Sequence, residues 1–377
     1  MTDDRTQITE VDSLEPTTEL LIIGGGPAGL MAALSASEYG VDITLIDEND
    51  RLGGQLIKQT HMFFGSHQEK AGIRGIDIGS QLSAEVKKRG IRVLLNSTVI
   101  GYYEGNQIAI LQTDRLEKIK TEALVVATGA AENIVSFPNN DLPGVYGAGA
   151  VQTLMNVYGV RPGKRVLMVG SGNIGLIVSY QLLQAGVSVV AVIEALPKIG
   201  GYLVHASKIA RTGVPILVSH TIKEAIGKEE VEGAVIVKID KNWRLIAGTE
   251  KKLKIDTICL AVGLSPLTEI LWQAGCEMYY IPELGGHVAW HNEDMETSVQ
   301  GIYVAGDVSG IEEASTAMLE GQLAGLAAAE SIKNLSLDKE KAQVRERLSL
   351  LRAGPFGEKP RIGKQKLQIS ADKISQD

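Results

Sequence analysis

Continuous apolar runs alternate with helix-like segments along the first third of the chain. Residues 19–23, ELLII, form an uninterrupted apolar run that is typical of a buried parallel strand. A glycine-rich turn follows, then a helical pattern to about Tyr39 and a second apolar strand over 41–47. Residues 91–127 alternate in short β-like pieces that end at residues 128–129. This order predicts a βαβ unit followed by a β meander.

The same order recurs further along the chain. RVLMV at 165–169 is the apolar strand, a glycine turn follows, and residues 173–186 read as a helix. A second strand is predicted over 187–194, and a β-rich stretch over 214–261 closes at a Val-Gly pair. Two copies of one unit favour a doubly wound α/β architecture over a chance motif, with two Rossmann-like, three-layer ββα domains.

The two copies have similar lengths. Gly24 to Gly129 spans 105 residues, and Gly170 to Gly263 spans 93. GIYVAGD at 301–307 is another apolar strand with a helix-like segment after it, and we expect it to return to the first domain. The second domain is then an insertion. The predicted divisions are a flexible N-terminus (1–17), a first domain (18–133 plus 286–333), a second domain (134–285) and a charged C-terminal tail (334–377).

Each copy carries the spacing G-x-G-x-x-G between strand and helix. The first glycine permits a tight turn, the second allows backbone to approach a pyrophosphate, and the third lets helix and strand pack closely. The helix N-terminus then offers free N–H groups to an anion. The glycines are Gly24, Gly26 and Gly29 in the first copy and Gly170, Gly172 and Gly175 in the second.

An acidic residue ends the strand after each turn, where it is expected to bind a ribose hydroxyl. Asp47 stands 18 residues after Gly29, and Glu194 stands 19 residues after Gly175. Glu48 competes with Asp47, which we prefer. An acid at Glu194 repels a 2′-phosphate and favours NAD over NADP, although Lys198 lies close in sequence.

Composition excludes several classes of protein. The formal net charge of −8 gives no electrostatic footprint for nucleic acid. The acidic N-terminal residues do not resemble a signal peptide, and no apolar run is long enough to span a membrane. Cys259 and Cys276 form no C-x-x-C pair. The sequence therefore predicts a soluble, cytoplasmic protein.

Five motifs resemble those of two-dinucleotide-binding-domain flavoproteins, the pyridine-nucleotide-dependent FAD oxidoreductases. The resemblance covers about residues 18–333 and implies FAD at the first glycine turn and NAD(P)H at the second. The motifs are GGGPAG at 24–29, GGQ at 53–55, VVATGA at 125–130, GSGNIG at 170–175 and TSVQGIYVAGDVSG at 297–310.

The resemblance also implies roles for single residues. Asp307 would hold the ribityl–pyrophosphate region of FAD, the helix after it would point at the flavin, and Thr128 and Gly129 would pass close to FAD. We nominate no catalytic side chain, because a hydride step requires no protein acid or base, and no metal. The predicted cofactor-binding residues are Gly24, Gly26, Pro27, Ala28, Gly29, Asp47, Glu48, Gly54, Gln55, Val99, Ala127, Thr128, Gly129, Gly170, Gly172, Asn173, Ile174, Gly175, Glu194, Gly263, Gly306, Asp307 and Ala314.

Within this family the thioredoxin-reductase type needs a C-x-x-C, which this chain lacks. The segments 47–55, 274–280 and 295–325 look more like the FAD-containing subunits of sarcosine oxidase, L-proline dehydrogenase, hydrogen cyanide synthase and opine oxidase. That branch implies a separate, amine-oxidising partner, often together with an iron–sulfur element. No cysteine follows Asp307, so any cluster would lie on a partner. A homo-oligomer is the other assembly considered.

Three functions follow from these patterns. The first is hydride transfer between NAD(H) and FAD in the electron-transferring subunit of an amino acid or amine dehydrogenase complex. The second is a free-standing NADH:acceptor reductase. The third is a flavin-bearing scaffold subunit whose second nucleotide does not react.

Several further residues have structural and functional interpretations. His61 and His67, in the loop 59–67, could polarise the flavin or touch a substrate, but hydrogen-bonded loop histidines are the preferred interpretation. Glu312 and Glu313 are interpreted as helix-dipole acids. Cys259 is expected in the core, and Cys276 is at most a minor redox candidate. The tail is expected to be solvated and partly mobile in preference to a docking arm, with a short amphipathic helix around Leu337–Leu351.

Overall fold

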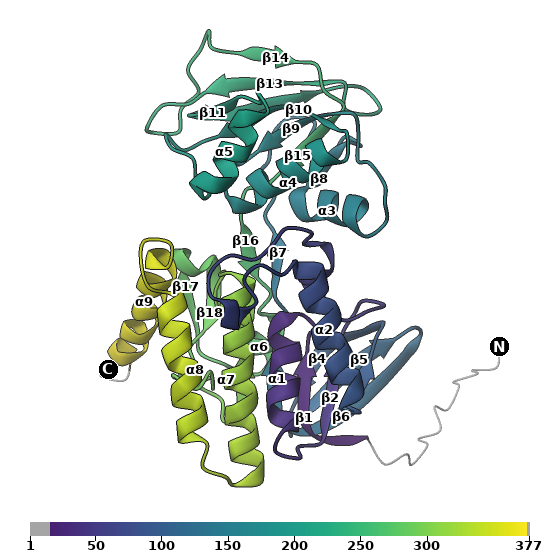
Figure 1. Ribbon diagram of the computed structural model, residues 1–377, viewed down its shortest axis with the longest axis vertical. Coiled ribbons are helices and arrows are strands. Elements are labelled where there is room, and N and C mark those ends of the chain that lie inside the picture. Colours follow the sequence, from purple (N-terminus) through teal and green to yellow (C-terminus); the bar gives the residue numbers. More distant parts are fainter. Residues whose placement is uncertain (1–15, 375–377) are drawn as a thin grey trace, which may run out of the picture.

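The computed structural model describes residues 16–374 as two lobes connected by a narrow waist (Figure 1). Two short antiparallel strands form that waist, β7 (Ala130–Glu132) and β16 (Leu264–Pro266). We call the lower part of Figure 1 the first lobe and the upper part the second lobe. The predicted N-terminal flexible segment lies almost wholly in residues 1–15, outside the described residues.

The first lobe is built on a seven-stranded sheet. Strands β3, β2, β1 and β6 are parallel and adjacent in that order, and β5 and β4 extend the sheet as an antiparallel meander. Strand β19 pairs in parallel with the end of β6, so the chain returns to this sheet after leaving the second lobe. The strands are β1 (Thr17–Ile23), β2 (Ile43–Ile46), β3 (Arg92–Leu94), β4 (Ser97–Tyr103), β5 (Gln107–Gln112), β6 (Arg115–Val126) and β19 (Ile302–Val304).

Helices α1 (Pro27–Ser37), α2 (Gly75–Lys88) and α7 (Ala314–Lys333) pack in this lobe. Two glycines allow α7 to approach α1 very closely. An added Cβ at Gly321 would lie 2.0 Å from the carbonyl oxygen of Ala28, and one at Gly325 would lie 2.3 Å from that of Ala32. This packing fastens the returning segment to the first βαβ unit.

The second lobe has three layers. A parallel sheet, in the order β11-β10-β9-β15-β8, carries helices on one face and an antiparallel sheet on the other. Alternate residues of β9 divide between them: Val166 and Met168 pack toward the helices, while Leu167 and Val169 pack toward the second sheet. The elements are β8 (Val145–Gly147), β9 (Arg165–Val169), β10 (Ser188–Glu194), β11 (Ile216–Val218), β15 (Thr257–Leu260), α3 (Ala148–Asn156), α4 (Asn173–Gln184), α5 (Leu203–Arg211), β12 (His220–Ile226), β13 (Gly233–Lys238) and β14 (Lys251–Leu253).

After the waist the chain forms α6 (Glu269–Gln273), β17 (Met278–Ile281), η3 (Pro282–Leu284) and β18 (Gly286–Ala289) before it returns to the first sheet. The 3₁₀ turn η4 (Gly306–Ser309) follows β19, and η1 (Gly54–Lys58) and η2 (His67–Glu69) lie in the loop before α2. The α/β class with parallel sheets, predicted from the apolar runs, is confirmed. Among residues 16–374 no helix is both long and apolar enough to cross a bilayer.

The prediction of a solvated C-terminal tail is wrong. Helices α8 (Asp338–Leu351) and α9 (Glu358–Ile374) pack against the first lobe (Figure 1). Lys341 is buried and pairs with Asp294 and Glu330, and Leu367 is fully buried beside β17 and β18. The charged composition suggested exposure to solvent, but several of these charges have buried partners in the rest of the lobe.

Candidate dinucleotide sites

The first glycine turn shows three different environments for its three glycines. Gly24 has φ +104°, and an added Cβ there would lie 2.2 Å from the carbonyl oxygen of Ala127. A Cβ at Gly29 would lie 1.8 Å from the oxygen of Gly24. At Gly26 the nearest atom would be Cα of Gly54, 3.9 Å away. The first and third glycines are therefore needed by the fold, whereas a Cβ at the second would make only this one ordinary contact.

The second turn repeats this geometry. Gly170 has φ +106°, and its Cβ would lie 2.2 Å from the oxygen of Ala261. A Cβ at Gly175 would lie 2.2 Å from the oxygen of Gly170, and one at Gly172 would have no heavy atom within 4 Å. Both turns thus keep room for a group that must approach the backbone closely.

The helices after the turns have N-termini without side-chain caps. Gly26 caps α1, which begins with Pro27 and Ala28, and Gly172 caps α4, which begins with Asn173 and Ile174. Neither helix has an acidic residue in its first turn. Uncapped N–H groups and the positive end of the helix dipole fit a pyrophosphate at both positions.

The two strand-end acids bind their own glycine turns. Asp47 Oδ2 accepts a hydrogen bond from the Gly25 N–H at 2.6 Å, and Glu194 Oε2 accepts one from the Ser171 N–H at 2.9 Å. Each acid therefore lies at the turn that sequence spacing predicted, and each also orders the loop that follows it, since Asp47 Oδ1 accepts from the Asn49 N–H at 2.8 Å.

Two other predicted residues lie near Asp47. Glu48 is exposed and makes no side-chain hydrogen bond among the described residues. The N–H of Ser97 donates to the oxygen of Asp47 at 3.0 Å, which brings β4, and Val99 within it, to this end of the sheet. The choice between Asp47 and Glu48 as ribose ligand stays a prediction.

The GGQ segment is joined to the first turn. The N–H of Gly53 donates to the oxygen of Gly25 at 2.8 Å, and an added Cβ at Gly54 would lie 2.7 Å from Cα of Gly26. Gln55 follows in η1. A side chain at Gly54 would displace the turn, so the glycine there is a packing requirement as well as a predicted contact.

The glycines that close the two copies lie at opposite ends of the β7–β16 pair that forms the waist. Thr128 Oγ1 donates to the oxygen of Leu267 at 2.6 Å, and the Leu267 N–H donates to Gly129 at 3.0 Å. The N–H of Asn133 donates to Gly263 at 3.0 Å. Ala127 follows β6, which ends at Val126. Ala127, Thr128 and Gly129 thus lie together where the chain leaves the first lobe, whereas Gly263 lies at the other end of the waist, beside Asn133.

A family model described as pyridine nucleotide-disulphide oxidoreductase matches residues 18–321. The chain belongs to this family. It is an FAD/NAD(P)-dependent oxidoreductase, and membership implies FAD and a pyridine nucleotide as its cofactors, which the two open glycine turns fit.

Several relatives of this chain are named as subunits of enzymes. One of the opine oxidase subunits of Agrobacterium tumefaciens is 26% identical, with 90% of this chain and 71% of the relative covered. A hydrogen cyanide synthase subunit of Pseudomonas protegens is 29% identical, covering 81% and 69%. The alpha subunit of sarcosine oxidase from Corynebacterium sp. is 26% identical, covering 84% of this chain and 33% of the relative. The predicted resemblance to this branch is confirmed.

Solved structures agree on the fold. L-proline dehydrogenase from P. horikoshii superposes with a TM-score of 0.67 at 24% identity, covering 90% of this chain and 60% of that one. Thioredoxin reductase from T. acidophilum gives 0.70 at 22% identity, covering 84% and 99%.

In this oxidoreductase the Gly306-Asp307 motif lies at a buried turn beside the first glycine site. Gly306 has φ +78°, and an added Cβ would lie 3.0 Å from that of Ala28. Burial raises the pKa of Asp307 to about 6, and Glu320 and Glu312 add to the rise. Asp307 Oδ1 accepts from the Glu312 N–H at 3.3 Å, two residues before Ala314 begins α7.

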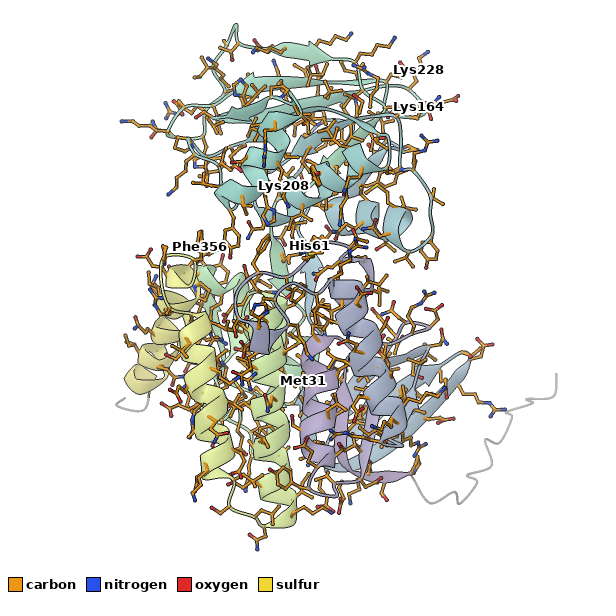
Figure 2. All side chains as sticks on the ribbon, viewed as in Figure 1. Met31, His61, Lys164, Lys208, Lys228 and Phe356 are labelled. Atoms are coloured by element: carbon orange, nitrogen blue, oxygen red, sulfur yellow. The ribbon has the colours of Figure 1, made fainter. Side chains whose placement is uncertain are left out.

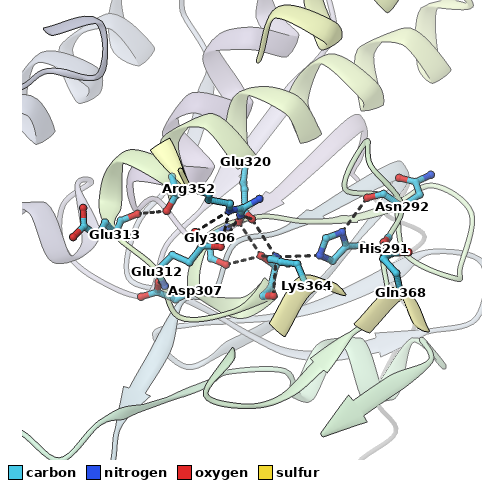
Figure 3. A network of polar contacts seen from close by, with 12 residues as sticks. His291, Asn292, Gly306, Asp307, Glu312, Glu313, Glu320, Arg352, Lys364 and Gln368 are labelled. Carbon is cyan, nitrogen blue, oxygen red and sulfur yellow. Dashed lines mark hydrogen bonds and ion pairs between the residues drawn. The ribbon is translucent and has the colours of Figure 1, made fainter. Parts of the chain in front are cut away.

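The sequence did not predict the buried ion network that holds this turn (Figure 3). Glu320 Oε2 accepts from the Gly306 N–H at 2.9 Å and from the Ser309 hydroxyl at 2.8 Å. Its Oε1 lies 2.6 Å from Nη2 of Arg352 and 3.1 Å from Nζ of Lys364. Burial alone would raise the pKa of Glu320, but these two cations outweigh it and hold that pKa well below its ordinary range.

Arg352 and Lys364 come from the segment predicted to be solvated. Arg352, at the end of α8, also binds Glu312 with both Nε and Nη2. Lys364, in α9, donates to the oxygen of Ser309 at 3.0 Å and to Nε2 of His291 at 3.1 Å. Burial and then Lys364 lower the pKa of His291 to about 3, so the ring is neutral at pH 7. The C-terminal helices therefore order the Gly306–Ser309 turn.

The remaining candidates fall into three places. Cys259 is fully buried in β15, as expected, and Cys276 is buried with Sγ 3.4 Å from the Thr297 hydroxyl; burial raises the pKa of both thiols. His67 is exposed in η2, whereas His61 has a buried Nδ1 without a partner among the described residues. The structure therefore does not show His61 as the hydrogen-bonded loop histidine that the sequence favoured. Glu313 accepts a hydrogen bond from the Tyr202 hydroxyl across the lobe boundary.

Proposed function

We propose that this enzyme transfers hydride between NAD(H), held by the second glycine turn, and FAD, held by the first. The observation that carries the proposal is the repeated turn, in which Gly26 and Gly172 both leave room for a Cβ before an uncapped helix. Two dinucleotide sites in one chain suit an enzyme that passes electrons between two dinucleotides. FAD supplies the redox chemistry when bound, while the chain binds and orients the reactants.

The FAD-binding domain in this proposal comprises 18–133 and 286–333, and the NAD-binding domain comprises 134–285. The first site uses the 24–29 turn, Asp47, the Gly306-Asp307 motif and the N-terminus of α7. The second uses the 170–175 turn, Glu194 and Gly263. No side chain is assigned as an acid or base, because hydride passes without protein proton transfer.

NAD is the proposed nucleotide in preference to NADP. Glu194 stands where the adenosine ribose is expected, and its carboxylate is fixed by Ser171, whose N–H and hydroxyl donate at 2.9 and 2.7 Å. A carboxylate in that place accepts from a ribose hydroxyl and repels a 2′-phosphate. The preference predicts that NADH, but not NADPH, reduces the flavin efficiently.

The names of the relatives support a place in an electron-transferring complex. The relatives from opine oxidase and sarcosine oxidase are each named as one part of an oxidase. We propose that this chain accompanies an amine-oxidising subunit in the cytoplasm, with any iron–sulfur element on a partner. A free-standing NADH:acceptor reductase is the second candidate, since both nucleotide sites lie in the one chain.

Anaerobic titration of the flavin-loaded protein with NADH and then NADPH tests the proposal. Bleaching of the flavin absorbance by NADH, with at least tenfold less effect from NADPH, is the expected result, on the order of 1.4 kcal/mol or more in discrimination. A protein that holds FAD and binds NADH but stays oxidised would replace the proposal with a flavin-bearing scaffold.

A matched pair of variants assigns the two turns. Gly172→Ala and Gly26→Ala each place a methyl group where there is room for it, so neither creates a clash within the chain. Gly172→Ala should retain FAD and lose reduction by NADH, while Gly26→Ala should purify with little FAD. Loss of FAD from both variants would contradict the assignment.

A further inference from the structure

A cavity of about 280 Å³ lies between the two lobes, apart from both glycine turns. Its lower wall is the loop 60–64 with Arg74 at the start of α2, and its upper wall is one side of α4 and α5. Lys208 on α5 and His61 on the loop lie on either side of the boundary (Figure 2). The α4 residues that line it begin at Leu176, after the last glycine of the turn. The cavity is too small for a dinucleotide.

Contacts between the lobes border this cavity. The side-chain amide of Gln181 in α4 donates to Oγ1 of Thr60 at 2.9 Å. The rings of Phe64 and His205 meet edge to face with centroids 5.6 Å apart. A molecule bound here would touch side chains from both lobes.

The charges that line the cavity are all positive. Arg74 contributes a guanidinium and Lys208 an ammonium, and no carboxylate lines it. Within residues 16–374 neither cation makes an ion pair or a side-chain hydrogen bond, and Lys208 Nζ instead lies 5.6 Å from the ring centroid of Tyr180. A guanidinium and an ammonium without acidic partners favour an anion such as a carboxylate or a phosphate.

His61, which also lines the cavity, carries a buried nitrogen atom. His61 Nδ1 is buried and has no hydrogen-bond partner among the described residues. Burial, helped by His205 and Lys208, lowers the pKa of His61 to about 4, so the ring is neutral at pH 7, with one nitrogen that donates and one that accepts. Buried polar atoms are seldom left unpaired, and a small turn of the ring would let a ligand in the cavity reach this one.

We propose that this cavity binds a small organic monocarboxylate with an apolar body. Arg74 and Lys208 would receive the carboxylate, His61 would supply a neutral hydrogen bond, and Phe64, Leu176 and Tyr180 would contact the apolar part. The site is independent of whether hydride passes between the nucleotides. Because its walls belong to both lobes, its ligand stabilises the lobe arrangement of Figure 1.

Calorimetric titration of the FAD-loaded protein with hexanoate and benzoate tests this site, with hexanamide and benzamide as uncharged probes of the same shape. The acids should bind about tenfold or more tightly than the amides, since hydrogen bonds to charged groups contribute about 1.5–3 kcal/mol. Arg74→Gln with Lys208→Gln should weaken the acids by a similar factor. Lys88→Gln with Arg211→Gln removes the same charge outside the cavity and should leave binding unchanged.

Three results would overturn the proposal. The first is no binding of either acid at millimolar concentration to protein that retains its FAD. The second is equal weakening by the control pair, which would show a general effect of charge. The third is equal weakening of NADH and of the acids by the cavity pair, which would assign the cavity to the nucleotide.

Discussion

At the scale of single residues, chemically identical glycines serve different needs. Gly24 and Gly170 have positive φ and no space for a Cβ, so any side chain there strains the turn itself. Gly26 and Gly172 have ordinary φ and open surroundings, so the chain alone would tolerate alanine. The absence of a side chain at these two positions is explained by what must approach them from outside.

The two acids at the end of β2 are distinguished by substitution. Asp47→Asn should weaken FAD binding by about tenfold or more, because the carboxylate that orders Gly25 through a 2.6 Å hydrogen bond becomes neutral. Glu48→Gln, at the exposed neighbour, should change it less than about twofold, as surface charges contribute little. Fluorescence titration of apoprotein with FAD measures both. The reverse ranking would assign the ribose to Glu48.

Asp307 gives a pH-dependent prediction. Its pKa is about 6 in the folded protein and about 3.9 in an unfolded chain, so the folded state holds an extra proton between these values. The stability that this group contributes is therefore greatest below pH 4 and falls as pH rises through 6. From pH 5 to pH 7.5, the difference in free energy of unfolding between Asp307→Asn and wild-type apoprotein should therefore shift in favour of the variant by about 1–2 kcal/mol. Urea unfolding at both pH values measures this, and a constant difference would contradict it.

At the scale of elements, helix α9 contributes through one buried lysine. Lys364 is buried against Glu320, while Lys366, two residues on, pairs with Glu283 near the surface. Breaking a buried ion pair leaves an uncompensated charge, whereas a surface pair contributes little. The two positions on one helix therefore form a matched comparison.

Lys364→Met should lower the free energy of unfolding by about 3 kcal/mol and release FAD more readily, because Glu320 then holds the Gly306 turn with one cation fewer. Lys366→Met should cost less than about 1 kcal/mol. Chemical unfolding of both variants measures the difference. Equal losses would mean that α9 stabilises the lobe by general packing and not through this network.

At the scale of the whole molecule, few direct contacts hold the two lobes together. Lys58 Nζ donates to the oxygen of Gly149 at 3.2 Å, and the Asn156 amide donates to the oxygen of Lys58 at 2.7 Å. On the other side Tyr202 of the second lobe packs on Phe356, with ring centroids 4.3 Å apart, and its hydroxyl donates to Glu313. Polar contacts of this kind permit the lobes to move relative to each other.

Removal of the Tyr202 side chain should loosen this arrangement. Tyr202→Ala loses both the ring contact with Phe356 and the hydrogen bond to Glu313, so the radius of gyration from small-angle X-ray scattering should increase. Tyr158→Ala, at a residue 66% exposed, serves as the control and should leave the scattering unchanged. An unchanged curve for both variants would show that the waist strands and Lys58 suffice to fix the lobes.

Comparison of the predictions with the structure separates local from distant causes. The strands, the helices after the glycines and the acids that end β2 and β10 were predictable because short apolar runs and residue spacing determine them. Glu320 could have given one more signal, as an acid in the middle of α7 among small and apolar residues that needed a cation. Its partners Arg352 and Lys364, 32 and 44 residues further on, stand in a charged segment where no sequence pattern indicates burial.

The sequence by itself determined the repeated α/β units and the two glycine turns proposed to bind dinucleotides, because steric limits on φ and on Cβ act within a few residues. Only the tertiary structure decided that α8 and α9 pack on the first lobe, that Arg352 and Lys364 meet Glu320, and that Arg74 and Lys208 line one cavity. Charge pairing depends on distance in space, and composition reports a charge without its partner.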